Sequence, residues 1–162
     1  NANCQCGLIA IEPYPNQTLK AGFPGLTQLI EQKIQDVNLS EIDRLQEDDI
    51  LFIDSSHTLK IGGDVQYEYM EILPRLNKGV IIHIHDIFLP AEYPKDWILN
   101  EHRFWNEQYL LQAFMTFNDR FEVLWASNYM HLNHDDKLRA VFTSYQRQER
   151  WPSSSFLMRK VK

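Results

Sequence analysis

Acidic side chains follow several apolar segments of this chain, at the points where each apolar run stops. Glu12 follows the run 7–11, Asp54 follows the run 49–53, and Asp86 comes soon after 80–84. Asp36 stands in the same relation to a weaker run. In open α/β sheets, ligands bind outside the carboxyl ends of the strands. We therefore expect the four acids to lie along one binding edge.

Three of these acids are predicted to bind a cofactor. A carboxylate after an early strand can accept two hydrogen bonds from ribose hydroxyls, which suits Glu12. Asp36 could accept a hydrogen bond from the exocyclic amine of a base, and Asp54 is the third predicted cofactor-binding acid. The alternative is that each acid simply forms a turn or caps a helix.

A second group, Asp54, His57, His85 and Asp86, is predicted to perform chemistry. If Asp54 and Asp86 end adjacent strands, then they could share a divalent cation, with His85 as a third ligand. Oxygen ligands favour Mg²⁺, and an added imidazole shifts the preference toward Mn²⁺. Such a cation lowers the pKa of a bound hydroxyl. Alternatively, His57 or His85 is a general base, so the predicted catalytic residues are His57, His85 and Asp86.

The apolar runs predict an α/β fold. Continuous rather than alternating runs are typical of strands that are covered on both faces. The expected architecture is a Rossmann-like, mainly parallel sheet with helices on both faces and one antiparallel strand near the C-terminus. The expected strands are 7–11, 28–34, 49–54, 80–84, 121–126 and 156–161. The expected helices are 40–45, 64–76, a long helix across 97–115, and 135–145.

Bulk composition limits the classes of function. A chain of 162 residues fits a single domain, and its net charge of −6 disfavours a nucleic-acid partner. No apolar run approaches about 18 residues, so no membrane span is expected. Cys4 and Cys6 are too close to form a good disulfide, which favours a reduced, cytoplasmic protein. Neither a P-loop, a Gly-x-Gly-x-x-Gly loop nor a Gly-x-Ser-x-Gly elbow occurs.

Four segments resemble class I S-adenosylmethionine-dependent methyltransferases. Residues 9–13 resemble their second strand with its ribose-binding acid, and residues 34–37 resemble the segment that approaches adenine. Residues 49–57 (DILFIDSSH) and 79–88 (GVIIHIHDIF) resemble the fourth and fifth strands of the macrocin O-methyltransferase-like subfamily. In metal-dependent members, the positions of Asp54 and Asp86 hold Mg²⁺. His85 stands where a second acid often appears.

The resemblance implies an O-methyltransferase that uses S-adenosylmethionine on a small hydroxylated acceptor, such as a sugar or a natural product. Family members begin with a strand and a glycine-rich turn, and nothing before Glu12 fits that pattern, so we expect an N-terminally truncated domain that could form a homodimer. One alternative is a degenerate, non-catalytic module that only binds a ligand. Another is a metal-dependent hydrolase that uses Asp54, His85 and Asp86.

Overall fold

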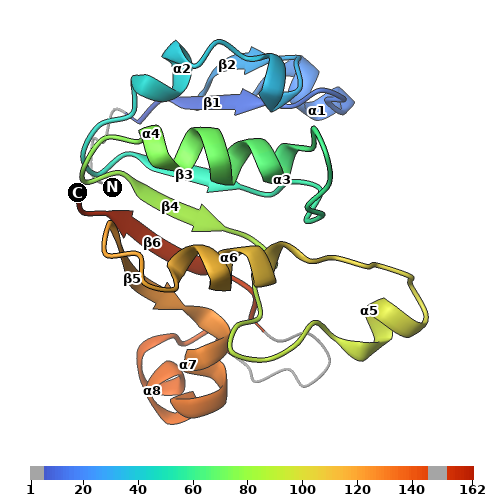
Figure 1. Ribbon diagram of the computed structural model, residues 1–162, viewed down its shortest axis with the longest axis vertical. Helices are drawn as coiled ribbons and strands as arrows, with labels where there is room; N and C mark the ends of the chain where they lie inside the picture. Colours follow the sequence, from blue (N-terminus) through green and yellow to red (C-terminus); the bar gives the residue numbers. More distant parts are fainter. Residues whose placement is uncertain (1–5, 146–152) are drawn as a thin grey trace.

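A computed structural model describes residues 6–145 and 153–162 of the chain (Figure 1). Strands and helices alternate along most of its length. The elements are β1 (Leu8–Ile11), α1 (Gln17–Ala21), β2 (Leu26–Ile30), the 3₁₀ turn η1 (Ile34–Asp36), α2 (Ser40–Asp43), β3 (Ile50–Ile53), α3 (Asp64–Tyr67), the π-helical turn η2 (Glu68–Ile72), α4 (Leu73–Arg75), β4 (Ile81–Ile84), α5 (Lys95–Leu99), α6 (Glu107–Met115), β5 (Phe121–Ala126), α7 (Ser127–Asn133), α8 (Asp135–Val141) and β6 (Phe156–Lys160).

The strands form two separate sheets. β1 and β2 pair in parallel as one sheet, and the other has the order β3-β4-β6-β5. β3 and β4 are parallel, whereas β6 runs antiparallel to both of its neighbours. The prediction of one antiparallel strand near the C-terminus is therefore confirmed. Among the described residues, the strands of the expected mainly parallel sheet are divided between two sheets, because β1 pairs with β2 and β3 pairs with β4.

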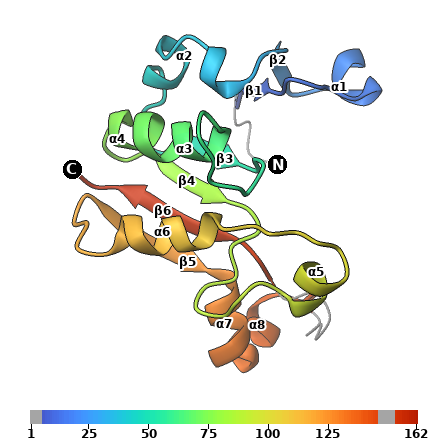
Figure 2. The same ribbon diagram turned by 45° about the vertical axis from the view of Figure 1, so that its right-hand side comes forward.

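The main core lies between the four-stranded sheet and the helical segment 64–75. Val65, Tyr69 and Leu73 face the sheet from this segment, and Ile82 and Ile84 face them from β4. All five side chains are almost fully buried. Leu111 of α6 joins the same cluster, so α3, η2, α4 and α6 cover one face of the sheet (Figures 1 and 2).

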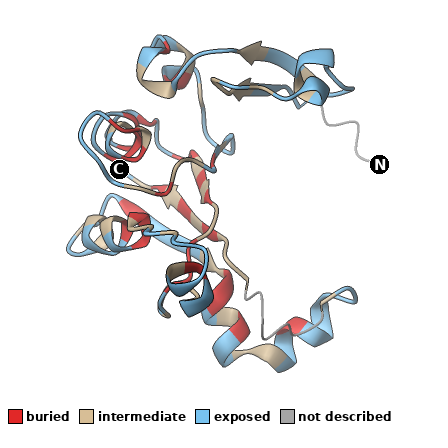
Figure 3. Ribbon diagram, turned by 90° about the vertical axis from the view of Figure 1, so that its right-hand side faces the viewer, coloured by how far each residue is buried: buried red, intermediate tan, exposed pale blue. Residues whose placement is uncertain are grey.

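The opposite face of the four-stranded sheet is open at β3. Ile50 and Phe52 alternate with the core-facing Ile53 and are 61% and 54% exposed. In β3 only Ile53 belongs to the buried class, and Figure 3 colours the ribbon by this burial. The prediction of helices on both faces is therefore not confirmed at this strand.

The β1–β2 sheet lies beyond β3 at one end of the molecule (Figure 1). Ile11 and Ile34 pack against the edge of the main core, and the Gln35 side chain donates a hydrogen bond to the Gly62 carbonyl at 3.0 Å. β2 ends at Ile30, so the strand expected over 28–34 is shorter and starts earlier than predicted. Asp36 consequently lies in the turn η1 and not directly after a strand.

The prediction of one long helix across 97–115 is wrong, because this region forms two helices. The chain leaves α5 at Asn100 and re-enters a helix at Glu107, and His102 between them adopts a left-handed conformation (φ 58°). The expected apolar face also divides. Trp97 packs with Phe88 and Tyr93 in a second cluster, whereas α6 packs on the main core.

Two smaller features complete the fold. Cys6 is a free, exposed thiol, and Cys4 lies outside the described residues. Among the described residues, no helix has the length and apolar character that a membrane crossing requires.

Candidate functional site

The ends of β3 and β4 bring the predicted catalytic residues together. The two strands are parallel and in register, with Ile53 opposite Ile84. The His85 amide donates a hydrogen bond to the Ile53 carbonyl at 2.9 Å, which extends the pairing by one step. Asp54 and His85 therefore leave the sheet side by side, as sequence reasoning expected.

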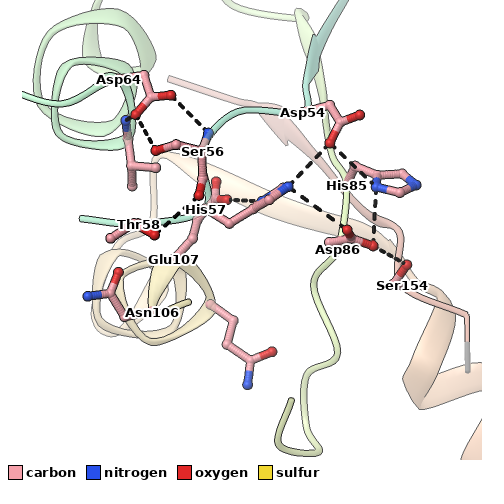
Figure 4. A network of polar contacts seen from close by, with 12 residues as sticks. Asp54, Ser56, His57, Thr58, Asp64, His85, Asp86, Asn106, Glu107 and Ser154 are labelled. Carbon is pink, nitrogen blue, oxygen red and sulfur yellow. Dashed lines mark hydrogen bonds and ion pairs between the residues drawn. The ribbon is translucent and has the colours of Figure 1, made fainter. Parts of the chain in front are cut away.

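His57 lies at the centre of a polar group that we call the rim network: Asp54, His57, His85 and Asp86 (Figure 4). The His57 Nε2 atom is 3.2 Å from Asp54 Oδ1 and 3.9 Å from Asp86 Oδ2. The side chain of His57 is only 5% exposed. Its imidazole therefore faces both carboxylates from the protein side of the network.

His85 lies on the outer side of the same carboxylates. Its Nδ1 atom is 3.2 Å from Asp86 Oδ1 and 3.6 Å from Asp54 Oδ1, and its side chain is 41% exposed. The Ser154 hydroxyl donates a hydrogen bond to Asp86 Oδ1 at 2.9 Å. Asp86 is thus held from both sides, and His85 is the imidazole that a ligand can reach.

Glu107, a residue that sequence reasoning missed, binds the other side of His57. Its side chain is fully buried at the start of α6, and its Oε2 atom lies 2.8 Å from His57 Nδ1. Its Oε1 atom accepts a hydrogen bond from the Tyr69 hydroxyl at 3.2 Å. One sequence pattern points to Glu107. Its spacing places it on the same helical face as Leu111 and Phe114, so it is a charged residue on an otherwise apolar face.

These contacts favour the charged form of His57. Burial alone would lower the pKa of the imidazole, because it disfavours the charged form. The hydrogen bond and negative charge of Glu107, together with the charges of Asp86 and Asp54, outweigh burial and raise the pKa of His57 above its ordinary value. His57 is thereby stabilised as a cation among carboxylates.

A tight loop after β3 delivers His57 to this position. The Ser56 hydroxyl and backbone amide donate hydrogen bonds of 2.6 and 2.8 Å to the Asp64 carboxylate. Burial opposes ionisation of Asp64, but these hydrogen bonds hold its pKa below the ordinary value. His57 and Asp86 both adopt left-handed backbone conformations with φ 54°. Such conformations are uncommon outside glycine and cluster at functional sites.

The other two predicted cofactor acids do not join the rim network. Glu12 follows β1 as expected, and its Oε1 atom accepts a hydrogen bond from the Tyr14 amide at 2.8 Å. Asp36 is exposed on η1. No hydrogen bond or ion pair among the described residues links either acid to the network, so the structure brings together Asp54, His57, His85 and Asp86 but not Glu12 and Asp36.

The predicted metal ligands Asp54, His85 and Asp86 do not fit a cation. Within the described ranges, no three His, Cys, Asp or Glu side chains are arranged so that they could hold a metal ion. The reason is visible in Figure 4, where an imidazole nitrogen of His57 faces the two carboxylates from the inside. The divalent cation is therefore not supported, and no step below depends on one.

An apolar depression of about 410 Å³ lies elsewhere on the surface. Leu89, Pro90, Trp125 and Met130 are among its lining residues, and it shares none with the rim network. Its lining offers almost no polar group. Because reactions need convergent polar groups, we assign the chemistry to the network and not to this depression.

The family of the chain follows from comparison with known sequences. A family model described as a methyltransferase domain matches residues 1–87, which is more than half of the chain. The chain therefore belongs to this methyltransferase family. The matched region includes β1 to β4 and all six predicted site residues, whereas Glu107 lies outside it. No curated protein and no solved structure shows significant similarity to the chain.

Proposed function

We propose that this protein is an S-adenosylmethionine-dependent O-methyltransferase of the macrocin type, acting on a small hydroxylated acceptor such as a sugar or a natural product. The observation that carries the proposal is the pair His85 and Asp86 at the end of β4 in a chain of the methyltransferase family. An accessible imidazole backed by a carboxylate can remove a proton from a hydroxyl group. The segments 49–57 and 79–88 support the macrocin-type assignment.

The chain offers acids that fit the nucleoside part of the cofactor. Glu12 stands at the carboxyl end of β1, and the Tyr14 amide occupies only one of its oxygens. The remaining acceptor sites suit ribose hydroxyls. Asp36 is exposed and suits the exocyclic amine of the adenine base. Asp54 is the third acid that we assign to the cofactor. When bound, S-adenosylmethionine supplies a methyl group on a positively charged sulfur.

The two histidines have different roles in this mechanism. His85 is the general base: its Nε2 atom takes the proton from the acceptor hydroxyl while its Nδ1 atom faces Asp86 Oδ1. The negative charge of Asp86, 3.2 Å from Nδ1, stabilises the imidazolium that forms. His57 is too deeply buried to reach an acceptor, and it remains behind Asp54 and Asp86, where the neighbouring carboxylates favour its charged form. The oxygen thus becomes more nucleophilic as the methyl group is transferred to it.

Isothermal titration with S-adenosylmethionine and with its demethylated product, S-adenosylhomocysteine, tests the proposal. We expect the protein to bind both compounds saturably. The Glu12→Gln variant is expected to bind both more weakly. An absence of binding heat at millimolar cofactor would contradict the proposed function.

A further inference from the structure

Glu107 carries two specific polar contacts despite its complete burial. One carboxylate oxygen meets His57 Nδ1 and the other accepts the Tyr69 hydroxyl. Ionised carboxylates are almost never fully buried without partners, because burial removes their hydration. A leucine or methionine of similar volume would fill this position with a smaller desolvation penalty. The presence of a carboxyl group at this position is therefore explained by its contacts with His57 and Tyr69.

The residues beside Glu107 also hold His57. The indole ring of Trp105 lies against the imidazole, with ring centroids 4.2 Å apart. The backbone amides of Asn106 and Glu107 donate hydrogen bonds to the His57 carbonyl at 3.0 and 3.2 Å. The Asn106 side chain accepts a hydrogen bond from the Leu59 amide at 2.6 Å. Three consecutive residues thus restrain both the ring and the left-handed backbone of His57.

Fixing one nitrogen of an imidazole fixes the other. With Nδ1 bound to Glu107, the His57 Nε2 atom points at Asp54 and Asp86, as Figure 4 shows. We propose that Glu107 is a positioning residue, which orients His57 so that its Nε2 atom faces the two aspartates that flank His85. The orientation stands on its own, and its consequence for catalysis rests on the function proposed above.

The histidine side chains of the unmodified protein give the first test. In protein labelled with ¹⁵N-histidine, long-range nitrogen–proton spectra report which ring nitrogen carries a proton. We expect the His57 Nδ1 proton to resonate at low field and to exchange slowly with water, since it lies in a buried bond to a carboxylate. A rapidly exchanging Nδ1 proton, or none, would overturn the proposal without any variant.

The Glu107→Gln variant gives the second test, because it preserves the volume and removes the charge. We expect the His57 Nδ1 proton to shift to higher field and exchange faster. Tyr69→Phe is the matched control, since it removes the other hydrogen bond of Glu107 and leaves the bond to His57. A His57 spectrum that is the same in Glu107→Gln and wild-type protein would overturn the positioning role.

Kinetics separate this inference from the proposed function. In an active enzyme, Glu107→Gln should lower kcat by about 10–100-fold with KM within about two-fold, because positioning groups act on the reacting side chains and not on ground-state binding. Unchanged kcat would overturn the catalytic consequence. If cofactor binding and methyl transfer are absent but the His57 spectrum depends on Glu107, then the proposed function fails and the positioning of His57 stands.

Discussion

The two sheets of this protein both end in acids, but they hold them very differently. In the four-stranded sheet, Asp54 and Asp86 are surrounded by two imidazoles and a serine hydroxyl. In the β1–β2 sheet, the hydrogen bond that the described residues give Glu12 comes from the Tyr14 amide of its own loop. The two sheets also differ in how deeply their strands are buried. No residue of β1 or β2 is buried, whereas Ile82 and Ile84 of β4 are fully buried.

Under the proposed function, the two sheets would contribute in different ways. A proton-transfer group must be held in one orientation, which requires packed neighbours and polar partners from several elements. A cofactor-binding acid needs free acceptor sites, because the ligand itself supplies the partners. The four-stranded sheet is therefore suited to preorganised chemistry, and the two-stranded sheet to reversible binding.

Replacing the exposed base should have the largest effect. In His85→Asn, we expect kcat for methyl transfer to fall by about 10²–10⁴-fold, the usual contribution of a general base. The measurement is transfer of labelled methyl from S-adenosylmethionine to a sugar or glycoside acceptor that the wild-type protein methylates. His102→Asn is the matched control, since His102 is exposed in a left-handed turn that asparagine accepts. Equal activity of the two variants would remove His85 from the mechanism.

The cores of the two sheets should respond unequally to truncation. Ile84→Ala should lower the free energy of unfolding by about 2–5 kcal/mol, because it opens a cavity in a fully buried site. Ile9→Ala, at a side chain that is 38% exposed, should cost about 1 kcal/mol or less. Urea unfolding measures both values. Similar losses at the two positions would show that the sheets do not differ in packing.

The buried acid Glu68 should give the stability of the molecule a pH dependence. Burial, with the negative charges of Glu107 and Asp64, raises the pKa of Glu68 to about 8 from 4.5. The folded state therefore binds a proton that the unfolded state releases, so stability should fall between pH 4.5 and about 8, by at most about 1.4 kcal/mol per pH unit.

Glu68→Gln isolates this contribution, because it keeps the volume and cannot ionise. The raised pKa of His57 also makes the free energy of unfolding fall as pH rises. A shallower dependence of that free energy on pH therefore remains in the variant. The measurement is the free energy of unfolding in urea at a series of pH values. An identical slope in wild type and variant would show that Glu68 is ionised in the folded protein.

The smallest effect is expected in the two-stranded sheet. Glu12→Gln should weaken S-adenosylmethionine binding by about ten-fold, since the amide replaces one charged acceptor of a ribose hydroxyl. Glu31→Gln is a matched control, because Glu31 follows β2 and forms an exposed ion pair with Lys20 at 3.7 Å. Titration calorimetry gives both dissociation constants. Equal affinities in the two variants would argue against a cofactor role for Glu12.

The sequence predicted what depends on local pattern. Continuous apolar runs located β1, β3 and β4, and the abrupt change to polar residues located Asp54, His85 and Asp86 at their ends. The antiparallel strand was also anticipated. The apolar runs and the polar residues that end them are patterns of neighbouring positions, so a single sequence is enough to reveal them.

Features that depend on distant contacts were missed. The break between α5 and α6 depends on a left-handed turn at His102, which apolar spacing does not reveal. His131 of α7 is buried and bonds the Tyr145 hydroxyl, a contact that no local pattern indicates. Glu107 bonds His57 although it lies fifty positions further along the chain. Its partner, and hence its role, is set by how α6 packs and not by its sequence neighbours.

A crystal structure of the protein with S-adenosylhomocysteine would test the central claim most directly. We expect the ribose hydroxyls to lie on Glu12 and the sulfur atom to lie on the side of the rim network where His85 is exposed, with Glu107 still bound to His57 Nδ1. A ligand seated in the apolar depression beside β5 and α7, away from Asp54 and His85, would contradict it.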